Sequence, residues 1–320
     1  MEIRVLRGLD IAALLPMAAC IELMRTTMIA VSEGRARVPL RSVTPVSGGG
    51  LMAMMPGYLA EPECFGIKLL SLFPGNPAAG LSSHLGLVLL FEPEHGQPVA
   101  MLDAAELTAI RTAAVSGLAT QLLAREDAGD LAILGSGEQA HSHLAAMRAV
   151  RQVRRVRVWS RNPDHAKSFA EAEQIEAVAS AEAAVTGADI VCTVTGAADP
   201  ILQGDWIAPG AHVNAVGASR IASAEVDTAA VAKARYFVDF RESALNEAGE
   251  LKCAIDAGAV TLAHIAGEIG EVASGAVAGR QHAEQITLFK SLGIAAEDLA
   301  AAHYVLEAAR ARGVGQVVEL

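Results

Sequence analysis

The spacing of apolar residues changes along the chain and predicts segments of different secondary structure. Residues 1–37 predict a short strand and then a helix, because apolar side chains recur at helical spacing over residues 11–31 and stop near Gly34. Residues 38–100 instead contain short apolar runs, such as residues 85–91, separated by clusters of Gly and Pro. This punctuation is typical of an antiparallel sheet.

The pattern becomes helical again from Asp103, and residues 107–125 predict one long helix. Short apolar strands then alternate with helices, an order typical of parallel βαβ units. Strands are predicted at residues 131–134, 156–159, 190–195, 212–216 and 236–239, and helices at residues 138–150, 163–173 and 181–185. The last stretch, residues 285–311, predicts helices around residues 289–293.

Composition narrows the classes of protein that fit this pattern. The chain has 320 residues, of which 52% are hydrophobic, enough for the cores of two domains. A net charge of −11 argues against nucleic acid as a partner, because phosphate contacts need clustered Lys and Arg. No apolar run suggests a membrane span or a signal peptide. The four cysteines form no CxxC pair, so we expect no metal site and a cytoplasmic location.

The loop after the strand at residues 131–134 has the pattern G-x-G-x-x-A, with Gly135, Gly137 and Ala140 at its small positions. Gly135 permits a tight turn, Gly137 lets the backbone approach a pyrophosphate, and Ala140 lets the following helix pack closely on the sheet. The N-terminus of that helix supplies free N–H groups to the phosphates. The position of the loop between a strand and a helix predicts a Rossmann-type domain that binds a nicotinamide dinucleotide.

The end of the second strand of this domain bears on the choice of dinucleotide. An NAD enzyme usually has Asp or Glu here to bind the ribose 2′-hydroxyl, but this chain has Ser160 and Arg161. Arg161 can donate a charge-assisted hydrogen bond to a 2′-phosphate, which favours NADP(H) over NAD(H). In the alternative interpretation, Arg161 stacks on the adenine and NAD remains usable.

Several motifs occur together in one order along the chain, and through them it resembles the ornithine cyclodeaminase/mu-crystallin family. They lie at residues 66–68, 107–114, 135–140, 212–218 and 289–293. The resemblance implies an α/β fold, with a Rossmann-type parallel sheet domain and a second α+β domain that binds substrate and forms a homodimer. We expect the second domain over residues 1–115, with C-terminal helices at about 300–320 returning to it, and the Rossmann domain over residues 116–300.

The resemblance also implies substrate-binding residues, and these make chemical sense. They are Arg41, Lys68, Ser83 and Arg111. Two Arg side chains can hold an α-carboxylate by bidentate geometry and so orient a C=N bond toward a hydride donor. Lys68 is the candidate catalytic residue, because a Lys within reach of an imine can donate a proton. Its place in an apolar strand supports this role, since Lys is rarely buried without a purpose.

The candidate cofactor-binding residues come from the same motifs and their neighbours. Arg111 and Thr112 belong to the long helix, and Thr195 and Ser219 are expected near the nicotinamide. The full set is Arg111, Thr112, Gly135, Gly137, Glu138, Gln139, Ser160, Arg161, Asn162, Thr195, Val216, Ser219, Ser291 and Leu292.

Two positions decide between the activities of the family. The cyclodeaminases that the chain resembles have two acids that recognise a distal amine, and the matching positions here are Ala53 and Ser219. Without these acids, a desolvated distal ammonium lacks its counter-charge. We therefore expect an NAD(P)H-dependent reductase that converts a small 2-imino acid, such as pyrroline-2-carboxylate, piperideine-2-carboxylate or iminosuccinate, into an L-amino acid. The alternatives are an ornithine cyclodeaminase-type lyase with recycled NAD and a non-enzymatic, cofactor-bound binding protein.

Overall fold

The computed structural model describes residues 2–73, 75–82 and 84–319. The chain forms two compact units. The first consists of Met1–Arg111 and Ile294–Leu320, and the second is Thr112–Gly293. The sequence predicts the divisions at residues 115/116 and near residue 300.

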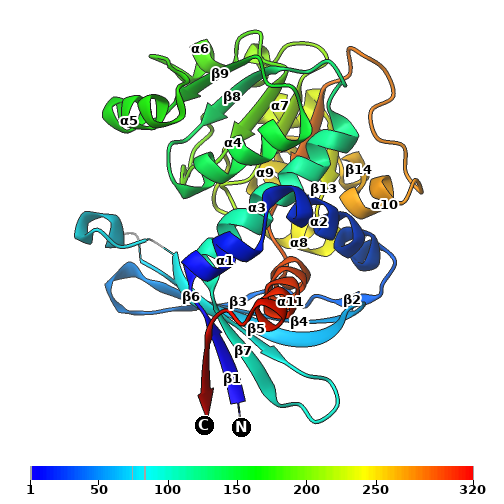
Figure 1. Cartoon of the computed structure of the whole chain (residues 1–320). Coiled ribbons are helices and arrows are strands. Elements are labelled where there is room, and N and C mark those ends of the chain that lie inside the picture. The colour runs from blue at the N-terminus through cyan, green and yellow to red at the C-terminus, as the bar shows by residue number, and fades with distance from the viewer. Residues whose placement is uncertain (1, 74, 83, 320) are drawn as a thin grey trace. The chain divides into compact units, whose positions relative to one another are not determined.

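A mixed sheet forms the framework of the first unit (Figure 1). Its strands follow the order β16-β1-β7-β6-β5-β4-β2, and β3 pairs with β4. Strands β1 and β7 run parallel, whereas the hairpins from β4 to β7 are antiparallel, as residues 38–100 predicted. The strands are β1 (Glu2–Leu6), β2 (Ala36–Arg37), β3 (Ser42–Pro45), β4 (Leu51–Ala60), β5 (Glu63–Leu72), β6 (His84–Phe91), β7 (Pro98–Asp103) and β16 (Gln316–Glu319).

The single helix predicted over residues 11–31 is wrong. The chain forms two helices, α1 (Gly8–Leu14) and α2 (Met17–Ser32), which meet at 84°. Pro16 lies at the break, because it has no N–H for a helical hydrogen bond and its ring clashes with the preceding turn. Among the residues that the structure describes, no single helix is long and apolar enough to cross a membrane, although α1 and α2 pass that test as a bent pair.

Helix α11 (Ala295–Arg312) lies across strands β4, β5 and β6 and beside α2 (Figure 1). Gly57 and Gly66 pair across the β4–β5 hairpin directly under it. A Cβ at Gly57 would lie 2.9 Å from that of Ala295, and a Cβ at Gly66 would lie 2.9 Å from Leu299 Cδ2. These two glycines therefore bring the first turns of α11 close to the sheet.

The second unit is an all-parallel sheet flanked by helices (Figure 1). Its strand order is β10-β9-β8-β11-β12-β15-β13-β14. The strands are β8 (Asp130–Leu134), β9 (Arg155–Trp159), β10 (Glu176–Ala177), β11 (Ile190–Thr193), β12 (His212–Ala215), β13 (Arg235–Val238), β14 (Ile265–Glu268) and β15 (Thr287–Lys290). The helices are α3 (Ala104–Leu123), which begins in the first unit, α4 (Glu138–Val150), α5 (Pro163–Glu173), α6 (Ala181–Val185), α7 (Thr228–Lys233), α8 (Arg241–Glu247), α9 (Gly249–Asp256) and α10 (Ile269–Ala273).

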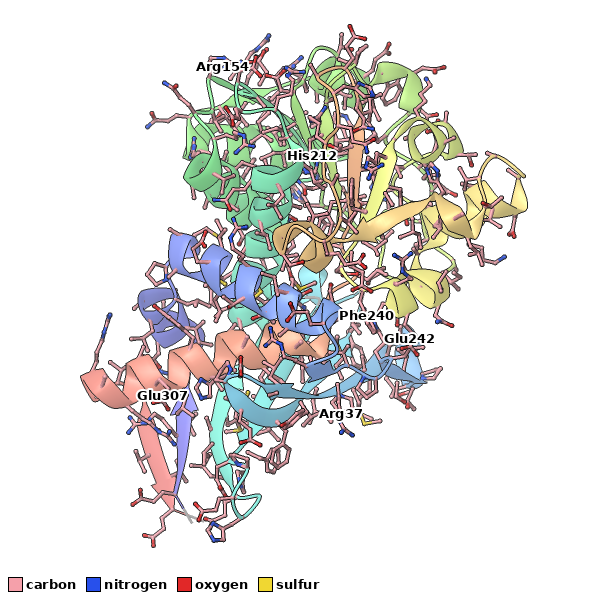
Figure 2. All side chains as sticks on the ribbon, turned by 90° about the vertical axis from the view of Figure 1, so that its right-hand side faces the viewer. Arg37, Arg154, His212, Phe240, Glu242 and Glu307 are labelled. Atoms are coloured by element: carbon pink, nitrogen blue, oxygen red, sulfur yellow. The ribbon has the colours of Figure 1, made fainter. Side chains whose placement is uncertain are left out.

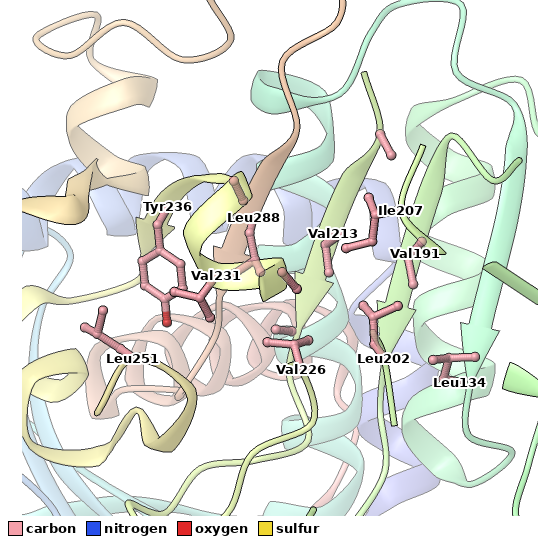
Figure 3. Packing of buried hydrophobic residues seen from close by; sticks show 14 of the residues in the cluster. Leu134, Val191, Leu202, Ile207, Val213, Val226, Val231, Tyr236, Leu251 and Leu288 are labelled. Carbon is pink, nitrogen blue, oxygen red and sulfur yellow. The ribbon is translucent and has the colours of Figure 1, made fainter. Parts of the chain in front are cut away.

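One row of buried side chains crosses this sheet and forms its core. Val191, Val213 and Leu288 lie in register on β11, β12 and β15, and Tyr236 continues the row on β13 (Figure 3). Val231 of α7 packs against the row. The core is filled mostly by Ala, Val, Leu and Ile, as the low aromatic content of the chain requires.

Part of the 212–218 motif has a structural role within the second unit. His212 is buried in the sheet (Figure 2), where Nδ1 lies 3.0 Å from Thr287 Oγ1 and Nε2 lies 3.2 Å from Asn214 Oδ1. Burial, with help from the Arg280 charge, lowers the pKa of His212 to about 3, so the ring is neutral at pH 7. Asn214 Nδ2 donates to Thr120 Oγ1 and so ties β12 to α3.

Strand β15 corrects the interpretation of residues 285–311 as helices only. Thr287–Lys290 is a fully buried strand between β12 and β13, and the helix begins only at Ala295. A buried run of four residues has no solvent-facing side to set a period, so the sequence pattern does not distinguish strand from helix. Strand β14 was not predicted either.

Candidate active site

The Gly-rich loop of the second unit has the geometry that its sequence predicts. Gly135 follows β8 with φ of 128°, and a Cβ there would lie 2.8 Å from the carbonyl oxygen of Val194. Only glycine accepts this backbone conformation at such a close approach. Gly137 caps the N-terminus of α4, and Ala140 is fully buried where α4 meets the sheet.

The same loop fits the phosphates of a dinucleotide. A Cβ at Gly137 would meet nothing within 4 Å, so open space lies where a phosphate must approach the backbone. The N–H groups of the first turn of α4, a 13-residue helix, point toward that space. Glu138 and Gln139 lie in this turn, and the buried Oε1 of Gln139 has no hydrogen-bond partner among the described residues.

The predicted cofactor residues of the second unit lie together at the carboxyl edge of its sheet. Gly135 follows β8, Ser160 follows β9, Thr195 follows β11, Val216 follows β12 and Ser291 follows β15. Strands β8 and β11 are neighbours from which the chain winds outward in opposite directions. Ligands of open α/β sheets bind outside the carboxyl ends of the strands at such a switch point.

Buried Glu225 fastens two of these strand ends. Its carboxylate accepts hydrogen bonds from Thr193 Oγ1 at 2.8 Å, from Thr195 N at 2.6 Å and Thr195 Oγ1 at 2.7 Å, and from Gly217 N at 2.6 Å. Burial raises the pKa of Glu225, and these donors, with the Lys290 charge, oppose the rise. Glu225 therefore fixes the loops that contain the predicted residues Thr195 and Val216.

Two further buried acids hold the end of β15. Glu250 Oε1 accepts from Lys290 Nζ at 3.0 Å, and both side chains are fully buried. Asp239 Oδ2 accepts from the backbone N–H of Leu292 at 2.5 Å and of Gly293 at 2.7 Å. The predicted residue Leu292 is thus held through its backbone, and Ser291 is buried with an Oγ that lacks a hydrogen-bond partner among the described residues.

The three predicted cofactor residues in the turn after β9 have different surroundings. Asn162 caps α5, because its Oδ1 accepts the backbone N–H of Asp164 at 3.0 Å. Its local role is therefore structural. Ser160 is half-buried and Arg161 is exposed at the same strand end, where the sequence predicts the 2′ position of the adenine ribose.

A compact cluster of four buried charges lies within the first unit. Lys68 of β5 donates from Nζ to Asp298 Oδ1 at 3.0 Å, and Arg111 of α3 donates from Nε to the same oxygen at 2.8 Å. Arg111 Nη1 also pairs with Glu297. Lys68 and Arg111 are 1% and 3% exposed, and the two acids are fully buried. The cluster contains two cations and two carboxylates.

Local geometry explains why Lys68 reaches this cluster. Gly66 and Lys68 are two residues apart on β5 and therefore share the face of the sheet under α11. Gly66 admits α11, and the first turn of α11 then presents Glu297 and Asp298 to Lys68. This arrangement accounts for the Gly-x-Lys spacing of the 66–68 motif.

Burial and the charges of the cluster shift the pKa of Lys68. Burial, together with the neighbouring positive charge of Arg111, lowers the pKa of Lys68 to about 8, while Asp298 opposes the shift and Arg41 adds to it. For Arg111, burial acts to lower the pKa, but Asp298 and Glu297 outweigh it and raise that pKa. Lys68 can therefore exchange a proton near neutral pH, and Arg111 stays charged.

The remaining predicted residues of the first unit are placed as follows. Arg41 is half-buried just before β3 and lies near enough to Lys68 to affect its pKa. The structure thus brings Arg41, Lys68 and Arg111 together. Two of the five N–H donors of Arg111 already bind carboxylates. Ser83 lies outside the described residues. Thr112, which begins the second unit, is buried on α3.

Sequence reasoning missed buried carboxylates in each unit. They are Glu297 and Asp298 in the first unit, and Glu225, Asp239 and Glu250 in the second. Glu297 and Asp298 do carry a signal, since they are adjacent acids at the start of an otherwise Ala-rich helix. Acids in a first turn are also ordinary helix-stabilising residues, so that signal does not point to a site.

The described part of the chain contains one group of side chains that could hold a metal ion. Glu92, Glu94 and His95 bring ligand atoms within 4.8 Å of one another in the β6–β7 turn. The Glu92 carboxylate accepts the backbone N–H groups of Glu94, His95 and Gln97. Its evident role is to hold this exposed turn.

Comparison with known proteins identifies the family. The family model for the ornithine cyclodeaminase/mu-crystallin family matches residues 1–313. The chain belongs to this family. The resemblance inferred from the motifs is therefore confirmed.

Individual relatives are similar over nearly their whole length. The chain is 41% identical over 278 residues to ketimine reductase mu-crystallin from Mus musculus, covering 86% of each chain. It is 36% identical over 296 residues to a Δ1-pyrroline-2-carboxylate reductase from Bacillus cereus, covering 90% of this chain and 91% of the relative.

Solved structures agree with the fold. The structure of Thermococcus litoralis Δ1-pyrroline-2-carboxylate reductase in complex with NADH and L-proline matches with a TM-score of 0.95 and 36% identity, covering 98% of this chain and 99% of that chain. An archaeal alanine dehydrogenase dimer with bound NAD matches with a TM-score of 0.93 and 31% identity over the whole of both chains. The predicted fold class, a Rossmann-type parallel sheet with a second domain built on a mixed sheet, is confirmed.

Proposed function

We propose that this family member is an NAD(P)H-dependent reductase that converts a small 2-imino acid into an L-amino acid. The main observation is the buried Lys68, whose pKa is lowered to about 8 beside Arg111 and Arg41. A proton donor next to two guanidinium groups suits a substrate that has both a carboxylate and a C=N nitrogen. The relatives named as ketimine and pyrroline-2-carboxylate reductases support this reading.

In this proposal each residue of the cluster has a distinct role. Arg41 and Arg111 bind the substrate carboxylate and thereby fix the orientation of the C=N bond. The Lys68 ammonium donates its proton to the imine nitrogen and is reprotonated from solvent. When bound at the Gly135–Gly137 loop of the second unit, the reduced dinucleotide supplies the hydride that the imine carbon accepts.

The test is the consumption of reduced cofactor with a panel of imines. We expect the protein to oxidise NADPH or NADH with pyrroline-2-carboxylate, piperideine-2-carboxylate or iminosuccinate, followed by absorbance. Release of ammonia from ornithine without reduction of any imine would contradict the reductase and favour the lyase. Tight cofactor binding without either reaction would favour the non-enzymatic binding protein.

Replacing Lys68 separates its chemistry from cofactor binding. Because a positioned general acid typically contributes 10²–10⁴-fold, we expect Lys68→Met to lower kcat by about that factor. Binding of the reduced cofactor, measured by fluorescence, stays unchanged. Lys252→Met is the matched control, since Lys252 is exposed and pairs with Asp256 on α9. Unchanged turnover in Lys68→Met would remove Lys68 from the mechanism.

We also propose that the cofactor is NADP(H) in preference to NAD(H). Exposed Arg161, in place of an acid after β9, supports this. The relatives of known structure contain NADH and NAD, so the comparison of both cofactors in the same assay decides the point.

The outer face of the first unit's sheet supports a homodimer. Burial alternates along β4 and β5, so that Ala53, Met55 and Lys68 are covered while the opposite face is apolar and open. Residues on that face include Met52, Leu85 and Leu87, each 40–41% exposed, and Phe65 stacks on Phe91 beside them. A contiguous apolar patch of this kind marks an interaction surface, and a relative forms a dimer.

A further inference from the structure

The first turn of α11 contains two buried acids that sequence reasoning did not assign. We propose that Asp298 is a positioning residue for the imine reduction proposed above: its carboxylate holds the Lys68 side chain in place and keeps it in the charged, proton-donating form. Glu297, the neighbouring acid, is bound to Arg111 and does not share this role. The catalytic effect of Asp298 rests on the proposed function, whereas its contacts with Lys68 and Arg111 do not depend on it.

The contacts of Lys68 support this assignment. In the described part of the chain, Asp298 is the one carboxylate that accepts a hydrogen bond from Lys68, at 3.0 Å between Nζ and Oδ1. The same oxygen accepts from Arg111 Nε at 2.8 Å. A single carboxylate oxygen therefore fixes the proton donor and one carboxylate-binding group relative to each other.

The charges around Lys68 show what Asp298 opposes. Arg111 of α3 and Arg41, before β3, are both positive and both disfavour a charged Lys68. From α2, Cys20 faces the same cluster, and burial raises the pKa of its thiol to about 12, so it brings no charge. From α11, Glu297 pairs with Arg111. Asp298 is thus the negative group in direct contact with the ammonium.

The second carboxylate oxygen of Asp298 argues against an ion pair that serves only to stabilise the fold. Oδ2 is buried and has no hydrogen-bond partner among the described residues, although buried carboxylate oxygens are normally satisfied. Replacing a buried ion pair by well-packed apolar residues is often neutral or stabilising. The cluster is therefore better explained by the control of Lys68 and Arg111 than by stability.

The experiment is the pH dependence of kcat/KM in three variants. In wild type, the fall of kcat/KM on the basic side of the pH profile (the basic limb) is expected near pH 8, where Lys68 loses its proton. Asp298→Asn removes the charge, so we expect the limb to move to lower pH by at least one unit, which lowers kcat/KM at pH 7 by about twofold or more. Glu297→Gln, one residue away on the same turn, is the matched control and leaves the limb in place. Asp298→Glu keeps the charge, so the limb stays while kcat falls because the carboxylate is displaced.

Two results would overturn the proposal. One is an Asp298→Asn limb that does not move, and the other is a limb that moves equally in Glu297→Gln. If Asp298→Asn does not fold, Asp298→Glu decides, since a limb shifted despite the retained charge contradicts the assignment.

A second readout does not depend on turnover. Because the unfolded chain keeps Lys68 protonated up to a pKa near 10.5, stability rises with pH between the folded and the unfolded pKa. In wild type, the unfolding temperature therefore contains a rising contribution above pH 8, which Lys68→Met removes. In Asp298→Asn, that contribution begins at lower pH. A wild type that reduces no imine would end the proposed function, and this stability profile would still decide the role of Asp298.

Discussion

At the scale of single residues, the protonation of Lys68 links the site to pH. The lowered pKa of about 8 means that the folded protein loses this proton well before an exposed lysine does. If the ammonium form is the proton donor, kcat/KM for imine reduction falls tenfold per pH unit above about pH 8. The pH profile of initial rates checks this. In the oxidative direction, the neutral amine accepts the proton, so a rate that also falls above pH 8 would contradict the assignment.

Arg161 makes a second prediction at this scale. A hydrogen bond to a charged phosphate contributes about 1.5–3 kcal/mol, so Arg161→Ala is expected to lower kcat/KM for NADPH by roughly 10- to 100-fold and to leave NADH unaffected. Arg155→Ala is the matched control, because Arg155 is exposed at the start of β9, the strand that Arg161 follows, and pairs with Glu176. Equal losses with both cofactors would instead indicate that Arg161 stacks on the adenine.

At the scale of elements, the β8–α4 loop contains two glycines with different reasons to be glycine. Gly135 has positive φ and touches Val194, whereas Gly137 has an ordinary extended conformation with open space around it. The fold requires glycine at position 135, whereas at position 137 we propose that the bound dinucleotide requires it. The sequence motif treats them alike.

Substituting each glycine separates the two needs. Gly135→Ala is expected to destabilise the protein by about 1–3 kcal/mol, because strain and a close contact add. Gly137→Ala is expected to leave the unfolding temperature unchanged and to weaken dinucleotide binding at least tenfold, because the new methyl occupies the space of a phosphate. Thermal unfolding and cofactor titration measure the two effects. Normal cofactor affinity in Gly137→Ala would contradict the proposed phosphate site.

Helix α11 shows how one element depends on another. Its first turn presents Glu297 and Asp298 to Lys68 because Gly57 and Gly66 let it approach the sheet. The Gly66–Lys68 spacing can therefore be recognised in the sequence. The hydrogen-bond partner of Lys68, Asp298, lies 230 residues away and cannot be.

At the scale of the whole molecule, the apolar outer face of the first unit's sheet predicts self-association. Leu87→Asp places a charge on that face, so we expect a dimer to become a monomer, measured by light scattering after size-exclusion chromatography. Leu262→Asp is the control, because Leu262 is also exposed but belongs to the second unit. A wild-type protein that is monomeric at micromolar concentration would contradict the proposal.

Local signals in the sequence were sufficient for much of this molecule. Short apolar runs separated by Gly and Pro predicted the antiparallel hairpins. The alternation of short apolar runs with helical segments predicted the first βαβ units. The Gly135–Ala140 loop predicted the dinucleotide fold through sterics that involve only a few neighbouring residues. The 66–68 motif singled out Lys68, since a lone charge in an apolar strand is conspicuous.

Tertiary structure alone decided what those residues touch. The carboxylates Glu225, Asp239, Glu250, Glu297 and Asp298 act across long sequence separations, and each has an ordinary local explanation as a cap or a surface acid. Strand β15 is buried on both faces and so has no period to read. The reason is physical: apolar spacing and backbone sterics are set by near neighbours, whereas the pKa of Lys68 depends on charges that only folding brings close, such as Asp298 at 3.0 Å.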